Sequence, residues 1–294
     1  MSDIKLFRYK PNVKELKAEG VLLERELQTV IEKHMQDFFG VTFLESEYTI
    51  DGGRMDSIGI DENYCPVIFE YKRSINENVI NQGLFYLDWL LEHKDSFELL
   101  VLKKLNQKIA EQIDWSMPRL ICIAGDFNKY DEKAIKQINR NISLIRYKKF
   151  NDEIILFELL NTNTVKPLKE DEKINQGSAI KPFTEQYEKA PSAIKELFDE
   201  VKAYALSLGD DVSENIVKPY TAFKKIKNFA TVEIFQTKLL VDYRLNPDNY
   251  ELSDKLRDIR NIGHRGCGDL QLTLSSKNDI ELAKELMWKA YEEN

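Results

Sequence analysis

The chain has 294 residues, 43% of them hydrophobic, and carries a formal net charge of −8. This length suits one large domain or two ordinary ones, and the composition excludes a disordered or fibrous chain. No stretch approaches the roughly 20 apolar residues that a membrane span needs, and the start MSDIKLFRYK has no signal-peptide core, so we expect a soluble, cytoplasmic protein without a membrane partner.

In chain order, the first predicted element is a helix over 21–39, where apolar side chains recur at helical spacing and Gly40 follows as a stop. The pattern then changes to that of two strands, 41–50 and 54–60, joined by a tight turn at 51–53. These three segments predict a helix followed by a β-hairpin.

Strand and helix patterns continue to alternate up to residue 160. They predict strands at 67–72, 119–125, 142–150 and 153–160, and helices at 76–91 and 130–140. Such alternation is typical of an α/β (α+β) fold with a mixed β-sheet flanked by helices.

The composition becomes polar and linker-like over 163–183, and we place a domain boundary there. This divides the chain into a first domain at 1–162 and a second, smaller α+β domain at 184–294. In the second domain the patterns predict helices at 193–206 and 280–291 and strands at 232–234, 238–245 and 269–275.

The three cysteines, Cys65, Cys122 and Cys267, stand far apart and include no C-x-x-C pair. An odd, scattered set indicates neither a disulfide framework nor a zinc site, and the three histidines show no zinc spacing either. We expect reduced, buried thiols.

A Glu-x-Lys triplet occurs four times, so the triplet alone identifies nothing. We expect three of the four to lie in helical or irregular sequence, where residues two apart diverge by about 200°. Only Glu70 and Lys72 fall in a predicted strand, where residues i and i+2 share a face. Because the same strand is otherwise apolar, two charges there are costly unless they serve each other, a metal or a ligand. A surface salt bridge at a strand end is the alternative.

Asp56 lies on the preceding predicted strand, where hairpin pairing can bring its carboxylate beside Glu70. Asp56, Glu70 and the backbone carbonyl of Tyr71 offer the oxygen ligands that Mg²⁺ prefers. A bound metal lowers the pKa of water and stabilises charge on a reacting phosphate, while Lys72 can orient the water or hold that charge.

The first helix offers a further acid. At 100° per residue Glu24 lies within about 60° of the apolar stripe, whereas Glu26 falls nearly opposite. We therefore predict Glu24 as a metal or water contact, the alternative being a carboxylate favoured by the helix dipole. Gln82 and Tyr86, one turn apart on a later helix, can both face the site.

Together these residues resemble the PD-(D/E)xK nuclease superfamily, in particular its NucS-like and RecB-like branches. The resemblance covers residues 20–160 through GGRMDSIGID, PVIFEYKR and NQGLFY. It implies a restriction-endonuclease-like core, a catalytic and metal-binding role for Asp56, Glu70 and Lys72, and substrate binding or site support by Gln82 and Tyr86. We add Arg54 and Arg73, which lie within the same motifs, as substrate-binding residues.

Our leading hypothesis is a Mg²⁺-dependent DNA endonuclease, with Mn²⁺ as a substitute, acting in repair or in defence against foreign DNA. The second domain is then expected to select substrate or mediate assembly, which leaves a homo-oligomer open. The alternative is a non-catalytic nucleic-acid- or protein-binding module that retains the nuclease fold.

Three other regions invite a binding function. The window 101–150 has eleven basic residues against five acids and can face phosphates or merely be solvated. Lysines near Tyr220, Phe223 and Phe229 can form a base-stacking surface or an amphipathic edge. The glycine-dense loop 263–269 can cradle an anion or form a plain turn.

Overall fold

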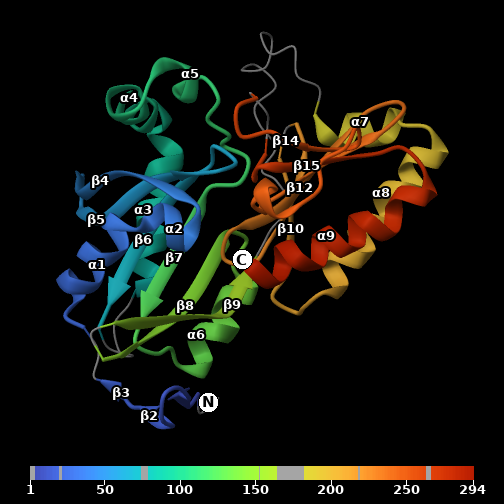
Figure 1. Cartoon of the computed structure of the whole chain (residues 1–294). Coiled ribbons are helices and arrows are strands. Elements are labelled where there is room, and N and C mark those ends of the chain that lie inside the picture. Colours follow the sequence, from blue (N-terminus) through green and yellow to red (C-terminus); the bar gives the residue numbers. More distant parts are fainter. Residues whose placement is uncertain are drawn as a thin grey trace.

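The computed structural model describes residues 4–19, 22–73, 79–151, 153–163, 182–217, 219–262 and 266–294. The first part of the chain is built on a seven-stranded mixed sheet in the order β3-β8-β7-β6-β5-β4, with β9 also pairing β8 (Figure 1). The strands β6, β7 and β8 are mutually parallel, and the β4–β5 and β5–β6 pairs are antiparallel. Their bounds are β3 Ala18–Glu19, β4 Val41–Ile50, β5 Gly53–Asp61, β6 Pro66–Lys72, β7 Arg119–Ala124, β8 Asn141–Phe150 and β9 Ile154–Asn163.

Helices cover both faces of this sheet. One face packs against α1 and α2, and the other packs mainly against α3 and α4. The bounds are α1 Glu24–Lys33, α2 Met35–Phe39, α3 Val79–Glu92, α4 Lys94–Lys104, α5 Gln107–Ala110 and α6 Lys129–Ala134, which continues as a 3-10 turn at Ile135–Gln137. The predicted mixed sheet flanked by helices is therefore confirmed. Within the described ranges, no helix is both long enough and apolar enough to cross a membrane.

The helix predicted over 21–39 is interrupted at His34, whose φ of −124° and ψ of 24° are not helical. The interruption shifts the register of α2, so that Phe39 is buried while Phe38 is only partly buried. Gly40 ends α2 with a φ of 64°, in the left-handed conformation expected of a glycine stop.

Ahead of α1 the chain forms a two-stranded antiparallel hairpin from β1 Leu6–Arg8 and β2 Lys14–Leu16. The sequence patterns gave no element here and none over 94–110, where α4 and α5 form. Both hairpin strands have only three residues, which is too short for a recognisable period of two.

The second part has a six-stranded antiparallel sheet, ordered β10-β11-β12-β13-β15-β14, and a hydrophobic core of its own. The α+β class expected for this part is confirmed, and the linker predicted at 163–183 falls almost entirely on 164–181, outside the described residues. The bounds are β10 Ser213–Ile216, β11 Thr221–Lys224, β12 Asn228–Ile234, β13 Leu239–Tyr243, β14 Leu256–Asp258, β15 Leu270–Leu274, α7 Phe183–Lys189, α8 Ser192–Ser207 and α9 Ile280–Glu293, with 3-10 turns at Pro247–Asn249 and Lys277–Asp279.

The two sheets meet at the turn between β5 and β6. Its Asn63 side-chain oxygen accepts hydrogen bonds from the Tyr220 hydroxyl at 3.0 Å and from Asn228 Nδ2 at 2.8 Å. Glu62 in the same turn forms an ion pair with Arg244. The second sheet therefore docks on one particular end of the first.

The prediction of a base-stacking surface around Tyr220 is wrong. Tyr220, Phe223 and Phe229 are at most 2% exposed, and Lys224 is 5% exposed, because these residues pack inside the second part and at its contact with the first. Lys218 lies outside the described residues. The three cysteines are free and buried, as expected.

Candidate active site

The candidate site lies where β5 and β6 separate. Their antiparallel pairing ends at Ser57 and Phe69, and the next residues in register are Asp56 and Glu70. Side chains replace the backbone ladder at this fork: the amide of Asp56 donates to Glu70 Oε1 at 3.3 Å, and the amide of Tyr71 donates to Asp56 Oδ2 at 2.9 Å. The fork thus supplies partners for freed backbone amides and places two carboxylates side by side.

Burial makes these two carboxylates costly to ionise. Glu70 is fully buried, and its Oε2 has no hydrogen-bond partner. Burial, and then the charge of Asp56, raises the pKa of Glu70 to about 9. Burial also raises the pKa of Asp56 to about 6, although the Tyr71 amide and Lys72 oppose the shift. A cation between the two acids would remove much of this cost.

Lys72 adds the third member. Its side chain is 12% exposed, and its Nζ donates to Glu24 Oε1 at 3.2 Å. Burial acts to lower the pKa of Lys72, but the charges of Asp56 and Glu24 outweigh it and raise the pKa above its usual value. The structure therefore brings Asp56, Glu70, Lys72 and Glu24 together, and their catalytic and metal-binding roles stay predictions.

The other Glu-x-Lys triplets differ from this one in burial rather than only in geometry. Glu15 lies in strand β2, contrary to the expectation of irregular structure, but it is exposed in the hairpin. Glu200 and Lys202 lie in helix α8, as expected. The Glu70 triplet is distinguished by having a fully buried acid.

A hydrogen-bond network on α1 supports the fork, and the sequence reasoning missed it. Gln28 Nε2 donates to the backbone carbonyl of Asp56 at 2.8 Å and to Glu32 Oε1 at 2.9 Å. Glu32 Oε1 also accepts from Ser57 Oγ at 2.6 Å, and Ser57 accepts from the Tyr71 hydroxyl at 3.1 Å. The signal was present, because residues 24, 28 and 32 repeat at four-residue spacing on one helix face.

Tyr86 on α3, together with Gln82, contacts the backbone just after the Gly-Gly turn between β4 and β5. The Tyr86 hydroxyl accepts from the amide of Arg54 at 3.2 Å and from Gln82 Nε2 at 3.0 Å. A Cβ at Gly53 would come within 2.7 Å of the Tyr86 ring, so this close approach requires glycine. Since Tyr86 is only 4% exposed, its contacts favour a positioning role over direct contact with substrate.

Arg54 and Arg73, the two arginines predicted to bind substrate, both lie on the surface. Arg54 is 62% exposed and pairs with Glu47 at 2.5 Å, and Arg73 is exposed directly after Lys72.

The basic window 101–150 contains two buried arginines. Arg119 forms an ion pair with Asp61, and Arg146 forms ion pairs with Asp126 and Glu158, so neither can face a phosphate without losing these partners.

A cavity of about 680 Å³ opens beside α1. Its lining includes Asp56 and Glu24 but not Glu70 or Lys72. Of the two acids Asp56 and Glu70, Asp56 is therefore the one that lines this cavity.

The donor set fits a hard divalent cation. The described ranges contain no group of three or more His, Cys, Asp or Glu side chains placed to hold a metal, and Glu24 is engaged with Lys72. Mg²⁺, however, is usually held by one or two carboxylates together with water and substrate phosphate. Asp56, the unpartnered oxygen of Glu70 and the carbonyl of Tyr71 offer such a set.

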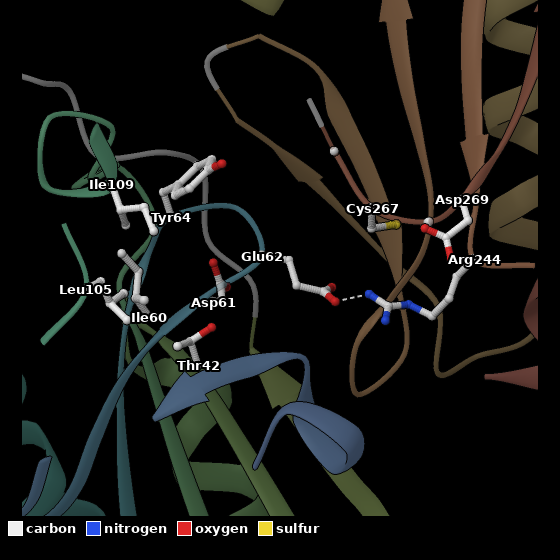
Figure 2. A pocket seen from close by; sticks show the side chains of 12 residues that line it. Thr42, Ile60, Asp61, Glu62, Tyr64, Leu105, Ile109, Arg244, Cys267 and Asp269 are labelled. Carbon is white, nitrogen blue, oxygen red and sulfur yellow. Dashed lines mark hydrogen bonds and ion pairs between the residues drawn. The ribbon is translucent and has the colours of Figure 1, made fainter. Parts of the chain in front are cut away.

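A second cavity, of about 370 Å³, lies between the two sheets (Figure 2). Asp61, Glu62 and Tyr64 line it from the first part, opposite Arg244 and Cys267 from the second. Glu62 and Arg244 pair across it, as the dashed line in Figure 2 shows. The glycine loop predicted to cradle an anion reaches this cavity with residues 266–269, while residues 263–265 lie outside the described part of the chain.

Comparison with known proteins gives three matches. Residues 183–294 match a family described as Domain of unknown function (DUF5655). A Haemophilus influenzae protein named "Uncharacterized protein" is 30% identical over 296 residues, which cover 96% of this chain and 97% of that protein. The crystal structure of a repair endonuclease from Pyrococcus abyssi matches 48% of this chain and 61% of its own, less than two thirds of its length, at 14% identity and a TM-score of 0.29.

Proposed function

This chain belongs to the same family as the Haemophilus influenzae protein, and we propose that it is a metal-dependent endonuclease that hydrolyses phosphodiester bonds in DNA. The observation that carries the proposal is the fully buried Glu70, whose Oε2 has no partner and which lies beside Asp56. Two acids with raised pKa values in one locus, next to a lysine, are typical of a functional site.

Asp56, Glu70 and the Tyr71 carbonyl are the groups that would hold Mg²⁺ or Mn²⁺. When bound, the metal supplies a water of lowered pKa and offsets the charge that develops on the phosphate. Because the pKa of Glu70 is about 9, its carboxyl holds a proton at neutral pH and must release it to act as a ligand.

Lys72 contributes a fixed positive charge. Its ammonium is held by Glu24 and lies within the field of Asp56, so it stays protonated. From there it can orient the attacking water or stabilise charge on a phosphate oxygen. Glu24 acts by positioning Lys72.

The second part of the chain acts away from this chemistry. It docks on the β5–β6 turn, and Asp61 lies five residue steps beyond Asp56 along β5, which corresponds to about 17 Å at the usual strand rise. The cleavage site is therefore open to substrate at the opposite end of the sheet.

The test is direct. The purified chain is incubated with circular, linear, single-stranded and branched DNA in Mg²⁺ and in Mn²⁺, and products are resolved on gels. We expect cleavage that EDTA abolishes and that Lys72→Ala lowers by at least about 100-fold, as is common when a charge-stabilising group is removed. Lys202→Ala, in the matched triplet on α8, serves as the control and should cleave normally.

Two results would count against the proposal. Undiminished cleavage by Lys72→Ala would remove this site from the chemistry. Binding of DNA without cleavage in either metal would instead favour the non-catalytic module.

A further inference from the structure

The N-terminal hairpin has an unusual surface for a chain that is acidic overall. Three of its large apolar side chains are exposed: Phe7 by 49%, Tyr9 by 71% and Val13 by 75%. Residues 5–17 contain five basic residues, Lys5, Arg8, Lys10, Lys14 and Lys17, against the single acid Glu15, a net charge of +4. The rest of the chain therefore carries −12.

Folding of the hairpin buries little apolar surface. An isolated pair of strands is marginally stable, and only Leu6 and Leu16, which pair across the strands, are partly buried. An exposed apolar patch rimmed by polar residues is one mark of an interaction surface. One of the rings already accommodates a cation, since Lys10 Nζ lies 5.3 Å from the centroid of the Tyr9 ring.

The hairpin lies at the same end of the sheet as the candidate site. Lys72, Ala124 and Arg146 form one row across β6, β7 and β8, and β3 pairs with Lys149 and Phe150 just beyond that row. Three residues along β8 and two strand spacings across correspond to about 10 Å each. Figure 1 shows β2 and β3 at this end, on the side away from the second sheet.

The connection to the site is short. β3 follows the hairpin at Ala18–Glu19, and α1 begins at Glu24, whose side chain holds Lys72. The Tyr147 hydroxyl at the end of β8 donates to the carbonyl of Leu22, which ties the start of α1 to the same strand. Lys149, which pairs with β3, is thus roughly 14 Å from Lys72.

We propose that the hairpin Leu6–Leu16 binds a single-stranded segment of the nucleic acid that the site cleaves. Phe7 and Tyr9 stack on unpaired bases, and the surrounding basic residues contact the phosphates. The choice of single strands follows from the rings, because bases within a duplex present no free face for stacking. The inference rests on the proposed function, since the bound strand is the one presented to Lys72.

Binding is measured apart from cleavage, so that the two ideas can fail separately. Fluorescence anisotropy is recorded in EDTA with the full chain, using a labelled oligothymidylate and a duplex of the same length. The variant Phe7→Ala/Tyr9→Ala removes the rings and keeps the charge. The variant Arg8→Gln/Lys10→Gln/Lys14→Gln removes charge and keeps the rings, and Trp288→Ala, an equally exposed aromatic residue on α9, is the matched control.

We expect the ring variant to bind oligothymidylate at least about 30-fold more weakly, at one stacked base for each of the two rings, with a smaller effect on the duplex. The charge variant should bind both ligands more weakly. For each phosphate that it no longer neutralises, the log–log slope of the salt dependence should flatten by roughly 0.7 for the single strand and by roughly 0.9 for the duplex. Trp288→Ala should match the wild type, and all variants should keep the wild-type thermal midpoint because the hairpin is exposed.

Several results would overturn the inference. If the wild type cleaves DNA while both hairpin variants bind like the wild type, the hairpin has no such role and the proposed function stands. If the wild type neither binds nor cleaves, the proposed function fails and the inference fails with it. A ring variant that instead loses self-association in sedimentation would assign the hairpin to a second copy of this chain.

Discussion

Replacing Glu70 by Gln should stabilise the protein when no metal is bound and abolish its response to metal. The substitution keeps the shape of the side chain, and the amide oxygen of Gln can still accept from the Asp56 backbone amide. It removes only the ionisable group, which is fully buried.

The magnitude follows from the pKa shift. The pKa of Glu70 is raised from 4.5 to about 9, so the folded protein holds this proton between those values while the unfolded chain releases it. For an acid with a raised pKa, stability is complete below pH 4.5 and is lost as the pH rises towards 9. At pH 7 the loss is about 3 kcal/mol, from roughly 1.4 kcal/mol per pH unit, and Gln carries no such loss.

The assay is urea unfolding in EDTA between pH 5 and pH 8, followed by tryptophan fluorescence. Trp89 and Trp115 lie in the first part of the chain, so a Trp288→Phe background limits the signal to that part. We expect the gap in stability in favour of Glu70→Gln to be below about 1 kcal/mol at pH 5 and to widen to about 3 kcal/mol at pH 7. Glu92→Gln, an exposed acid in the same part, is the control and should show no widening gap.

Metal provides the second half of this test. Mg²⁺ or Mn²⁺ should stabilise the wild type in proportion to the logarithm of its concentration and leave Glu70→Gln unchanged. Identical pH profiles for the two proteins, or equal stabilisation of both by metal, would refute the reasoning from burial.

Two further predictions concern positioning and docking. Gln28→Ala removes the hydrogen bond to the Asp56 carbonyl and should lower kcat by about 10-fold with little change in KM, because a misplaced Asp56 affects the chemical step. A change in KM alone would contradict this prediction. Lys224→Met should stabilise the chain by about 4 kcal/mol at pH 7, because burial lowers the pKa of Lys224 to about 7 and the folded state disfavours its charge. That gain should shrink as the pH rises towards the usual lysine pKa of 10.5, which thermal unfolding at pH 7 and pH 9.5 can check, and a constant gain would contradict it.

Some features of the site followed from local sequence. The strand period placed Glu70 and Lys72 on one face, and the turn predicted at 62–66 brings the strand of Asp56 beside theirs. Helical spacing likewise pointed Glu24 towards the sheet, where it meets Lys72. These are short-range properties, because each depends on residues only a few positions apart.

Other features needed distant parts of the chain. Strand geometry could not separate the Glu70 triplet from Glu15, which also lies in a strand, and burial by α1, α3 and β7 made the difference. The sequence allowed the aromatic residues around Lys224 to form an exposed surface, whereas the structure buries them. A sequence does not show which face of a sheet is covered. The apolar spacing did not predict the break at His34 either, because the spacing continues across that residue.

The amino-acid pattern alone was enough to predict the order of most helices and strands, the mixed sheet and the set of groups that we propose to carry phosphodiester chemistry. Tertiary packing was needed to show that β5 and β6 separate at Asp56 and Glu70, that Glu70 has an unpartnered oxygen, and that the second sheet docks about 17 Å away. The difference arises because periodicity is local, whereas burial and the separation of two strands depend on what packs against them from elsewhere in the chain.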